Sequence, residues 1–308
     1  MEYTFGPVPS RRLGRSLGVN PIPFKTCNYS CVYCQLGHTI NFTNKRETFF
    51  PPDEMADEIV DVCKKKFDKL DYITFVGEGE PTLYKGLYIV VESIKKSCNK
   101  PIAIITNGGL FYEKEVRWDV SLFDVILSKI DAPDERTFRR INRPYKGITF
   151  EKFINGMMAL KNEFKGKLWI ETMLVKGIND TEDVLYKIRQ VLDTINPHKR
   201  FVSIPTRPPQ EEWVKIPDPD TLFKAFKILN AVPIYEVEYG EFDLGDSIEQ
   251  GILTLIKRHP LRMEEVLKVL RERGIDNPEE YMKRIQEKHG IKLKEFMGFT
   301  YLLPPERR

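Results

Sequence analysis

The sequence predicts an α/β fold in which a parallel sheet, either open or curled into a barrel, takes up most of the chain. Short apolar runs alternate with amphipathic stretches of helical length between residues 16 and 240, and this alternation is typical of βα units. Six or seven such units in about 225 residues are compatible with a partial or a complete barrel. After residue 245 the pattern changes to consecutive helices, which predicts a smaller second module.

The predicted strands of the larger region are short apolar runs bounded by turn-forming residues. They cover residues 16–20, 72–76, 102–106, 125–130, 168–175, 201–205 and 234–239. The predicted helices lie between them and carry apolar residues at helical spacing. They cover residues 53–67, 87–96, 150–164, 181–193 and 220–229.

The residue pattern in the last part of the chain predicts three helices followed by a strand pair. The helices cover residues 248–258, 262–273 and 278–288, and the strand pair lies within residues 291–303, around Gly298. Breaks between these elements fall at proline and glycine residues. Three helices followed by a hairpin is the outline of a winged-helix module. We therefore expect two domains, over residues 1–245 and 246–308.

Composition favours a soluble globular protein, with 41% hydrophobic and 30% charged residues among 308. No apolar stretch approaches the roughly 20 residues that cross a bilayer. Residues 1–15 lack the apolar core of a secretory signal. We therefore expect a cytoplasmic protein without a membrane partner. The formal charge of +3 gives nucleic-acid binding only weak support.

Three of the five cysteines lie close together, as Cys27, Cys31 and Cys34. Adjacent cysteines in a reducing compartment are more often metal ligands or catalytic groups than disulfides. The Cys-x-x-x-Cys-x-x-Cys spacing lets three thiolates bind three corners of one iron–sulfur cubane, with the fourth iron open to an external ligand. A structural zinc site with His38 as fourth ligand is the alternative. Cys63 lies on the apolar face of a predicted helix, which indicates core packing.

Polar, glycine-rich clusters follow the predicted strands, at residues 76–82, 106–109, 128–131, 176–180 and 206–209. The cysteine loop follows the first strand in the same way. Because chemistry gathers at the C-terminal ends of strands in βα barrels, all of these clusters are expected on one rim.

The cysteine spacing, with the aromatic Tyr33 just before the last cysteine, resembles the signature of the radical S-adenosylmethionine (radical SAM) superfamily. The resemblance implies a partial (βα)6 TIM-like barrel over about residues 1–240, to which the C-terminal module is added. It also implies that Cys27, Cys31 and Cys34 bind a [4Fe–4S] cluster. The open iron of that cluster would chelate the amino and carboxylate groups of S-adenosylmethionine.

Further segments resemble motifs of the same superfamily. Gly79 and Glu80 resemble the end of its Gly-Gly-Glu motif, with Glu78 in place of the first glycine, and a Thr-Asn-Gly turn recurs after the third strand. The resemblance implies cofactor contacts from Tyr33, Gly79, Glu80, Asn107, Ser128, Lys129 and Asp131. Equally, Lys129 and Asp131 can form a structural ion pair.

The resemblance implies that a one-electron donor such as flavodoxin or ferredoxin reduces the cluster. S-adenosylmethionine is then cleaved to methionine and a 5′-deoxyadenosyl radical, which abstracts a hydrogen atom from the substrate. The expected substrate is a macromolecule, tRNA or protein, presented partly by the C-terminal module. The barrel sequence is similar to small proteins grouped with tRNA wyosine-base synthases, although the extra N-terminal cysteines of the archaeal synthases are missing. No residue is assigned as a catalytic acid or base.

Two other functions are compatible with the sequence. The first is a glycyl-radical activating enzyme, because residues 169–180 resemble the fifth strand and the following loop of such enzymes. Those enzymes, however, place a basic residue near the position of Glu171. A zinc-stabilised winged-helix regulator that binds DNA without catalysis is the second.

Two groups of cations have alternative interpretations. Arg11, Arg12 and Arg15 can bind a phosphate or carboxylate, or they can form a solvated face or salt bridges at the open edge of the barrel. The predicted helix 262–273 carries cations that can meet phosphates, but glutamates on the same helix equally indicate a solvated face. The cations are Arg262, Lys268, Arg271 and Arg273.

Overall fold

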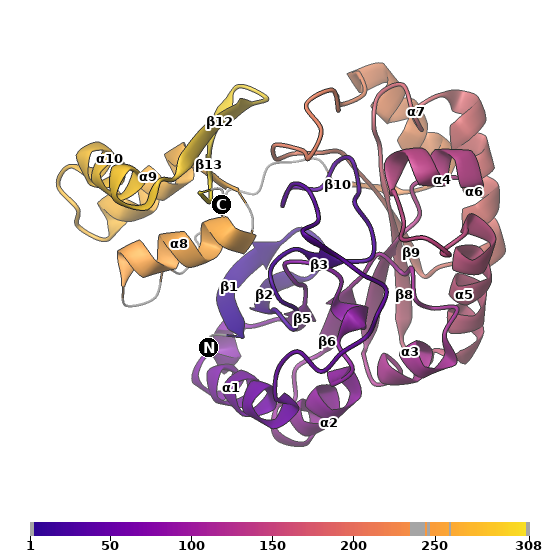
Figure 1. Ribbon diagram of the computed structural model, residues 1–308, viewed down its shortest axis with the longest axis horizontal. Coiled ribbons are helices and arrows are strands. Elements are labelled where there is room, and N and C mark those ends of the chain that lie inside the picture. Colours follow the sequence, from indigo (N-terminus) through magenta and orange to yellow (C-terminus); the bar gives the residue numbers. More distant parts are fainter. Residues whose placement is uncertain (1–2, 235–243, 245–246, 259, 306–308) are drawn as a thin grey trace.

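The computed structural model describes residues 3–234, 244, 247–258 and 260–305 (Figure 1). Its main feature is a curled sheet of eight strands in the order β1-β2-β5-β6-β7-β8-β9-β10. Every neighbouring pair is parallel except β1 and β2, which are antiparallel. The strands are β1 Thr4–Ser10, β2 Gly14–Val19, β5 Tyr72–Phe75, β6 Ile102–Ile105, β7 Val125–Lys129, β8 Lys167–Met173, β9 Lys199–Ser203 and β10 Val232–Ile234.

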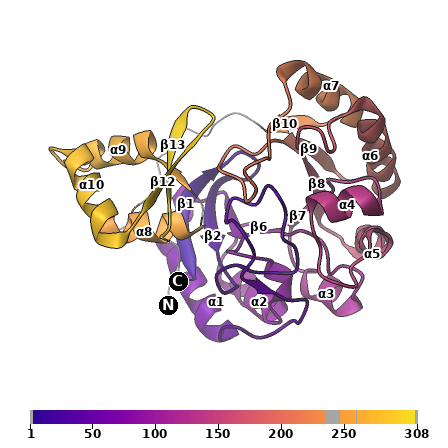
Figure 2. The ribbon, with the colours of Figure 1, turned by 45° about the horizontal axis from the view of Figure 1, so that its top comes forward.

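Helices cover the outer face of this sheet (Figures 1 and 2). They are α1 Pro52–Lys65, α2 Leu87–Ser97, α3 Lys114–Asp119, α4 Glu135–Ile141, α5 Phe150–Glu163, α6 Glu182–Ile195 and α7 Pro219–Leu229. Short elements complete the barrel region, namely β3 Thr26–Cys27, β4 Asn41–Phe42 and the 3₁₀ turns Phe67–Lys69 and Pro81–Leu83. The arrangement is a partial α/β barrel, as the sequence analysis predicted.

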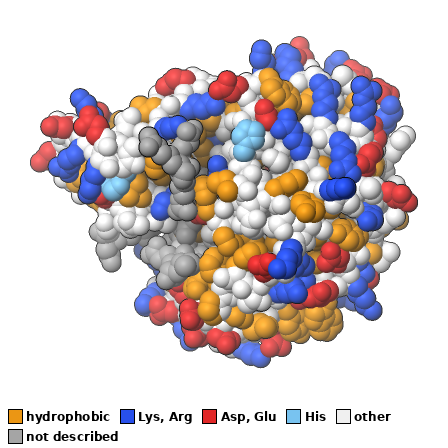
Figure 3. All heavy atoms as spheres, in the orientation of Figure 1, with side chains coloured by type: hydrophobic (Ala, Val, Ile, Leu, Met, Phe, Trp, Pro, Cys, Tyr) orange, Lys and Arg blue, Asp and Glu red, His pale blue; other side chains and the backbone are white. Residues whose placement is uncertain are grey.

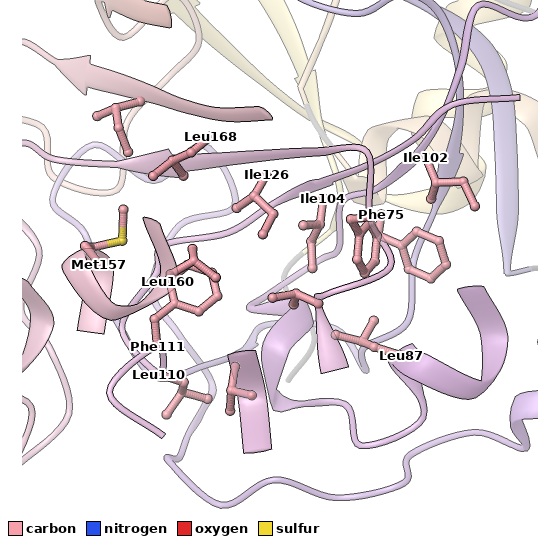
Figure 4. Close-up of a cluster of buried hydrophobic side chains, with 14 of the residues drawn as sticks. Phe75, Leu87, Ile102, Ile104, Leu110, Phe111, Ile126, Met157, Leu160 and Leu168 are labelled. Carbon is pink, nitrogen blue, oxygen red and sulfur yellow. The ribbon is translucent and has the colours of Figure 1, made fainter. Parts of the chain in front are cut away.

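The main core lies between the sheet and its helices (Figure 4). Phe75, Ile104 and Ile126 point from neighbouring strands toward Leu87 of α2 and Leu160 of α5, and all five are buried. Because side chains alternate along a strand, the intervening residues face the inside of the curl. A smaller apolar cluster lies on this inner side of the sheet. Its members are Leu13, Ala103, Val125, Leu127, Trp169, Phe201 and Ile234.

The predicted strands and helices that lie within the described residues are present, with ends that differ by a few residues. β1, α3, α4 and the short elements leave no clear periodic pattern in the sequence and were not predicted. β1 contains Pro7 and Pro9, which disfavour a strand interior but are tolerated at a sheet edge. The last predicted strand, 234–239, lies almost wholly outside the described residues. Cys63 is buried in the core as expected, and it is bonded to Cys98, a pairing that was not predicted.

The C-terminal region contains the three predicted helices and the predicted strand pair, and it lies beside β1 in both ribbon views (Figures 1 and 2). A short strand that was not predicted, β11, completes an antiparallel sheet in the order β11-β13-β12. The elements are α8 Ile248–Arg258, β11 Leu261–Arg262, α9 Met263–Glu272, α10 Pro278–His289, β12 Lys292–Phe296 and β13 Phe299–Leu303.

This region has an apolar core of its own, in which Val266, Leu270, Ile285 and Leu302 are buried. Phe5 of β1 packs against that core. None of the helices among the described residues is long and apolar enough to cross a membrane.

We predict that Phe75→Ala lowers the free energy of unfolding by about 3–5 kcal/mol, because it removes a large buried ring and leaves a cavity. Phe75 has no exposed surface and packs edge-to-face on Phe123, with ring centroids 5.3 Å apart. Urea denaturation measures the change. The matched control is Phe223→Ala, at a side chain that is 59% exposed, which should change stability by about 0.5 kcal/mol or less. Equal losses in the two variants would contradict the described core.

Candidate active site

The cysteine loop lies at the C-terminal end of the sheet, after β2. Cys27 ends β3, and Cys31 and Cys34 follow in a turn in which the amide of Cys34 donates to the carbonyl of Cys31 at 3.0 Å. All three cysteines are partly buried, and none is in a disulfide. The structure therefore brings the three predicted ligands together on one loop.

A close backbone contact joins this loop to the loop after β5. The amide of Glu80 donates to the carbonyl of Thr26 at 3.0 Å. A Cβ atom on Gly79 would lie 1.8 Å from the same carbonyl oxygen, so only glycine fits. Gly79 thus sets the position of the residue that precedes Cys27.

The carboxylate of Glu80 is buried and already accepts four hydrogen bonds. The donors are the amide of Thr82 at 3.0 Å, its hydroxyl at 2.6 Å, the hydroxyl of Thr106 at 2.5 Å and the amide of Asn107 at 2.8 Å. Burial raises the pKa of Glu80, against the opposing effect of these donors. In this structure Glu80 therefore holds the loops after β5 and β6 together.

Two side-chain amides lie against the cysteine sulfurs. Nδ2 of Asn107 is 3.8 Å from Sγ of Cys27, and Nδ2 of Asn142 is 3.7 Å from Sγ of Cys31. Burial raises the pKa of all three thiols, that of Cys31 to about 12. A bound metal deprotonates a coordinating thiol outright, and N–H groups beside the sulfur then stabilise the thiolate. Asn142 was not predicted as a site residue, because the fold alone brings the end of α4 to the cysteine loop.

Asp131, which follows β7, is a buried acceptor. It accepts from the hydroxyl of Tyr33, from Nδ2 of Asn142 at 2.8 Å and from the amide of Met173 at 2.8 Å. Burial raises its pKa, although Lys129 and these donors act in the opposite direction. Asp131 therefore positions Tyr33, the aromatic residue of the cysteine motif.

Glu171 has no exposed surface and lies between two cations. Arg12 contacts it at 2.5 Å, Lys129 pairs with it from the adjacent strand, and the hydroxyl of Ser203 donates to it at 2.7 Å. Burial alone would raise the pKa of Glu171, but Arg12 and Lys129 outweigh it and hold this pKa well below its usual range.

Two sequence-based interpretations change as a result, and the expectation of salt bridges from the N-terminal arginines is confirmed for Arg12 and Arg15. Lys129 is paired with Glu171, so the alternative of a Lys129–Asp131 ion pair was wrong. Two basic residues do lie beside Glu171, and they come from distant parts of the chain. Of the N-terminal arginines, Arg12 forms a buried salt bridge, whereas Arg15 pairs with Asp71 at the surface.

A cavity of about 400 Å³ opens beside the cysteine loop, a volume suited to a small ligand. The inner face of the sheet forms one side of it, and part of the C-terminal region forms another. Its lining includes five cations and two carboxylates, which are Arg11, Arg12, Lys129, Arg207, Arg262, Glu171 and Glu265.

The predicted site residues divide into two groups around this cavity. Tyr33, Cys34 and Lys129 line it. The others are not among its lining residues, and they are Cys27, Cys31, Gly79, Glu80, Asn107, Ser128 and Asp131. Ser128 is fully buried, and its hydroxyl lies 3.8 Å from the sulfur of Met157 in α5.

A single-ion site would need at least three ligands converging on one point. Within the part of the chain that the structure describes, no group of three or more His, Cys, Asp or Glu side chains is arranged to hold one metal ion. His38 instead contacts Gln210. In the orientation of the Gln210 amide that satisfies its neighbours, the amide oxygen accepts a hydrogen bond from Nδ1 of His38 at 3.0 Å.

The sequence is similar to that of known proteins over most of its length. The sequence profile of the Radical SAM superfamily matches residues 22–187. The UPF0026 protein of Methanocaldococcus jannaschii is 39% identical over 311 aligned residues, which cover 98% of this chain and 96% of that protein.

Two solved structures share the fold. A radical SAM methyltransferase from Sphaerobacter thermophilus superposes with a TM-score of 0.54 at 17% identity, over 72% of this chain and 67% of that chain. SuiB of Streptococcus suis, bound to S-adenosylmethionine, superposes with a TM-score of 0.54 at 13% identity, over 73% of this chain and 51% of that chain. At these identities the likeness establishes the fold alone.

We predict that Glu171→Gln lowers the free energy of unfolding at pH 7 by about 3–5 kcal/mol, because two partly buried cations lose their buried counter-ion. The folded-state pKa of Glu171 is lowered, so the pair stabilises the fold above the pKa of an ordinary glutamate, about 4.3. That stabilisation is lost as pH falls through the folded-state pKa. Urea denaturation at several pH values should show the difference between wild type and variant shrinking in acid.

The control is Glu163→Gln, which removes the partner of Arg117 at a side chain that is 50% exposed. A loss of less than about 1 kcal/mol is expected there. A Glu171→Gln effect that is equally large at acidic and neutral pH would contradict the ionic role of Glu171.

Proposed function

The chain belongs to the radical SAM superfamily, and from this membership we propose that Cys27, Cys31 and Cys34 bind one [4Fe–4S] cluster. The observation that carries the proposal is the loop that gathers three unpaired cysteines beside the cavity. Two amide groups, from Asn107 and Asn142, lie against the sulfurs of Cys27 and Cys31. Such donors are typical neighbours of cluster thiolates.

Cys27, Cys31 and Cys34 would hold the cluster, which would supply the one-electron reduction for cleavage of S-adenosylmethionine to methionine and the 5′-deoxyadenosyl radical that abstracts hydrogen. The protein binds and orients the reactants. Tyr33, held by Asp131, lines the cavity next to Cys34 and offers an aromatic face to the cosubstrate. Lys129 lies 5.7 Å from the centre of the Tyr33 ring and is oriented by Glu171. The cosubstrate contacts from Gly79, Glu80, Asn107, Ser128, Lys129 and Asp131 belong to the same proposal.

We propose that the substrate is a macromolecule, tRNA or a protein, and that residues 246–308 form a separate winged-helix-like domain that helps to present it. The cavity is bounded by both parts of the chain, because Arg262 and Tyr301 line it together with strands of the barrel. The hydroxyl of Tyr301 donates to the carbonyl of Thr206 at 2.7 Å, which ties the C-terminal region to the loop after β9. A flavodoxin or a ferredoxin is the proposed electron donor.

An activating enzyme for a glycyl-radical protein is a second candidate, and one observation favours it. The segment around Glu171 lacks the basic residue that such enzymes place there. In the folded chain, however, two basic residues, Arg12 and Lys129, contact Glu171. A glycyl-radical signal on a partner protein, detected by electron paramagnetic resonance after incubation with the reduced enzyme, would favour this candidate over RNA modification.

The first test is reconstitution with iron and sulfide under anaerobic conditions, followed by dithionite and S-adenosylmethionine. We expect a brown protein that produces 5′-deoxyadenosine, measured by liquid chromatography. A colourless protein that retains zinc and produces none would refute the proposal and favour the zinc-stabilised regulator.

The second test assigns the ligands. Cys31→Ala should abolish cluster binding, because three thiolates are needed for a stable site-differentiated cluster. Iron and sulfide content and the visible absorbance measure this loss. Cys98→Ala is the control, since Cys98 lies at the end of α2 and is bonded to Cys63, and it should retain the cluster. Full iron and sulfide content in Cys31→Ala would disprove the assignment.

A further inference from the structure

We propose that the cavity contains an anion site, formed by Arg262 and Arg207, that binds a phosphate group of an RNA substrate. The inference rests on the proposed function, because it names the substrate class of the same cavity. Arg262 comes from β11 in the C-terminal region and Arg207 from the loop after β9, so the site joins the two parts of the chain.

Arg262 is a buried cation with unused hydrogen-bonding capacity. The residue is only 4% exposed, and its Nη1 has no hydrogen-bond partner within the part of the chain that the structure describes. The nearest carboxylate oxygen to Nη1 belongs to Glu264, at 3.5 Å, on a side chain that is half exposed. A buried donor without an acceptor carries a free-energy cost, and a ligand with acceptor oxygens would remove it.

The guanidinium is held in place from one side. Nε donates to the hydroxyl of Tyr301 at 3.1 Å, and the guanidinium carbon lies 3.6 Å from the centre of the Phe299 ring. These contacts fix the plane of the Arg262 guanidinium group, so that less side-chain entropy is lost when a ligand binds.

Arg207 lies in the same cavity on the barrel side. Its Nη1 donates to Oε1 of Gln35 at 3.2 Å, and Gln35 directly follows Cys34. Arg207 and Arg262 both act on Glu265, because both lower its pKa against the larger effect of burial, which raises it. Both arginines and Glu265 are among the residues that line the cavity.

The charge of the cavity favours phosphate. Among the described residues that line it are five cations and two carboxylates, and one of these carboxylates, Glu171, is already paired with Arg12 and Lys129. The outer surface differs, since Figure 3 shows Lys, Arg, Asp and Glu interspersed over the face it presents. A tetrahedral phosphate can direct oxygens toward two guanidinium groups from different walls, whereas the two oxygens of a carboxylate lie in one plane. Arg is also the usual cation for such contacts with nucleic acid.

Two of the other cations of the predicted helix 262–273 have carboxylate partners at the surface. Lys268 pairs with Glu272 at 3.7 Å, and Arg271 pairs with Glu279, all on exposed side chains. Neither Lys268 nor Arg271 lines the cavity. Arg271 is therefore a matched control for Arg262.

The experiment measures binding of a short fluorescein-labelled single-stranded RNA to the full chain by anisotropy, at several KCl concentrations. We expect Arg262→Gln to weaken binding about tenfold. It should also reduce the slope of log K against log salt by about 0.7, as expected for one lost phosphate contact. Arg271→Gln should bind like wild type. Inorganic phosphate should compete, and uridine 5′-monophosphate should compete better than uridine.

Two further variants separate charge from folding. Arg262→Lys keeps the charge but loses the paired N–H donors of the guanidinium. RNA binding should therefore weaken severalfold, while the slope of log K against log salt stays near that of wild type. Glu265→Gln keeps an acceptor and removes a negative charge, so binding should tighten severalfold. Thermal unfolding of each variant identifies any that fail to fold, and the remaining variants then carry the test.

Three results would overturn the anion site. These are no RNA binding by wild type, equal binding by Arg262→Gln and Arg271→Gln when both are folded, and an acidic peptide that binds as tightly as RNA through Arg262. Binding is measured before and after cluster reconstitution. If reconstitution yields no cluster while RNA binding still depends on Arg262, the proposed function alone is refuted. If the cluster forms and RNA does not bind, the anion site alone is refuted.

Discussion

The buried carboxylate of Glu171 couples parts of the barrel that are far apart in sequence. Arg12 reaches it from the turn between β1 and β2, Lys129 from β7 and Ser203 from β9. A carboxylate without exposed surface is stable only where cations and donors replace its lost hydration. The N-terminal hairpin must therefore stay on the barrel for Glu171 to remain ionised, and the inner wall of the cavity depends on this arrangement.

The cysteine loop depends on a second constraint, which is close packing of backbone against backbone. Gly79 allows the loop after β5 to touch the carbonyl of Thr26, and the carboxylate of Glu80 links that loop to Asn107. Asn107 in turn lies against Cys27. Gly79, Glu80 and Asn107 therefore hold the cysteine loop in position, besides the cosubstrate contacts proposed for them, and the proposed cluster would bind to a loop that is already ordered.

The C-terminal region contributes to the same cavity from outside the barrel. Tyr301 makes the link, because its hydroxyl donates to Thr206 and accepts from Arg262. One hydroxyl therefore connects the proposed anion site to the loop that leads from β9. If the substrate is RNA, the two parts of the chain would select it together, the barrel by its chemistry and the C-terminal region by charge.

The sequence by itself determined the strand–helix order, the three helices and hairpin near the C-terminus, and the cysteine motif. These depend on local periodicity and on spacing within a few residues. Only the tertiary structure decided that Lys129 pairs with Glu171, that Asn142 lies against Cys31 and that Arg262 enters the cavity while Arg271 stays outside. The physical reason is that each of these contacts joins residues on different elements. A partner across the fold is set by the curl of the sheet and by docking of the C-terminal region, and neither leaves a periodic signal in the chain.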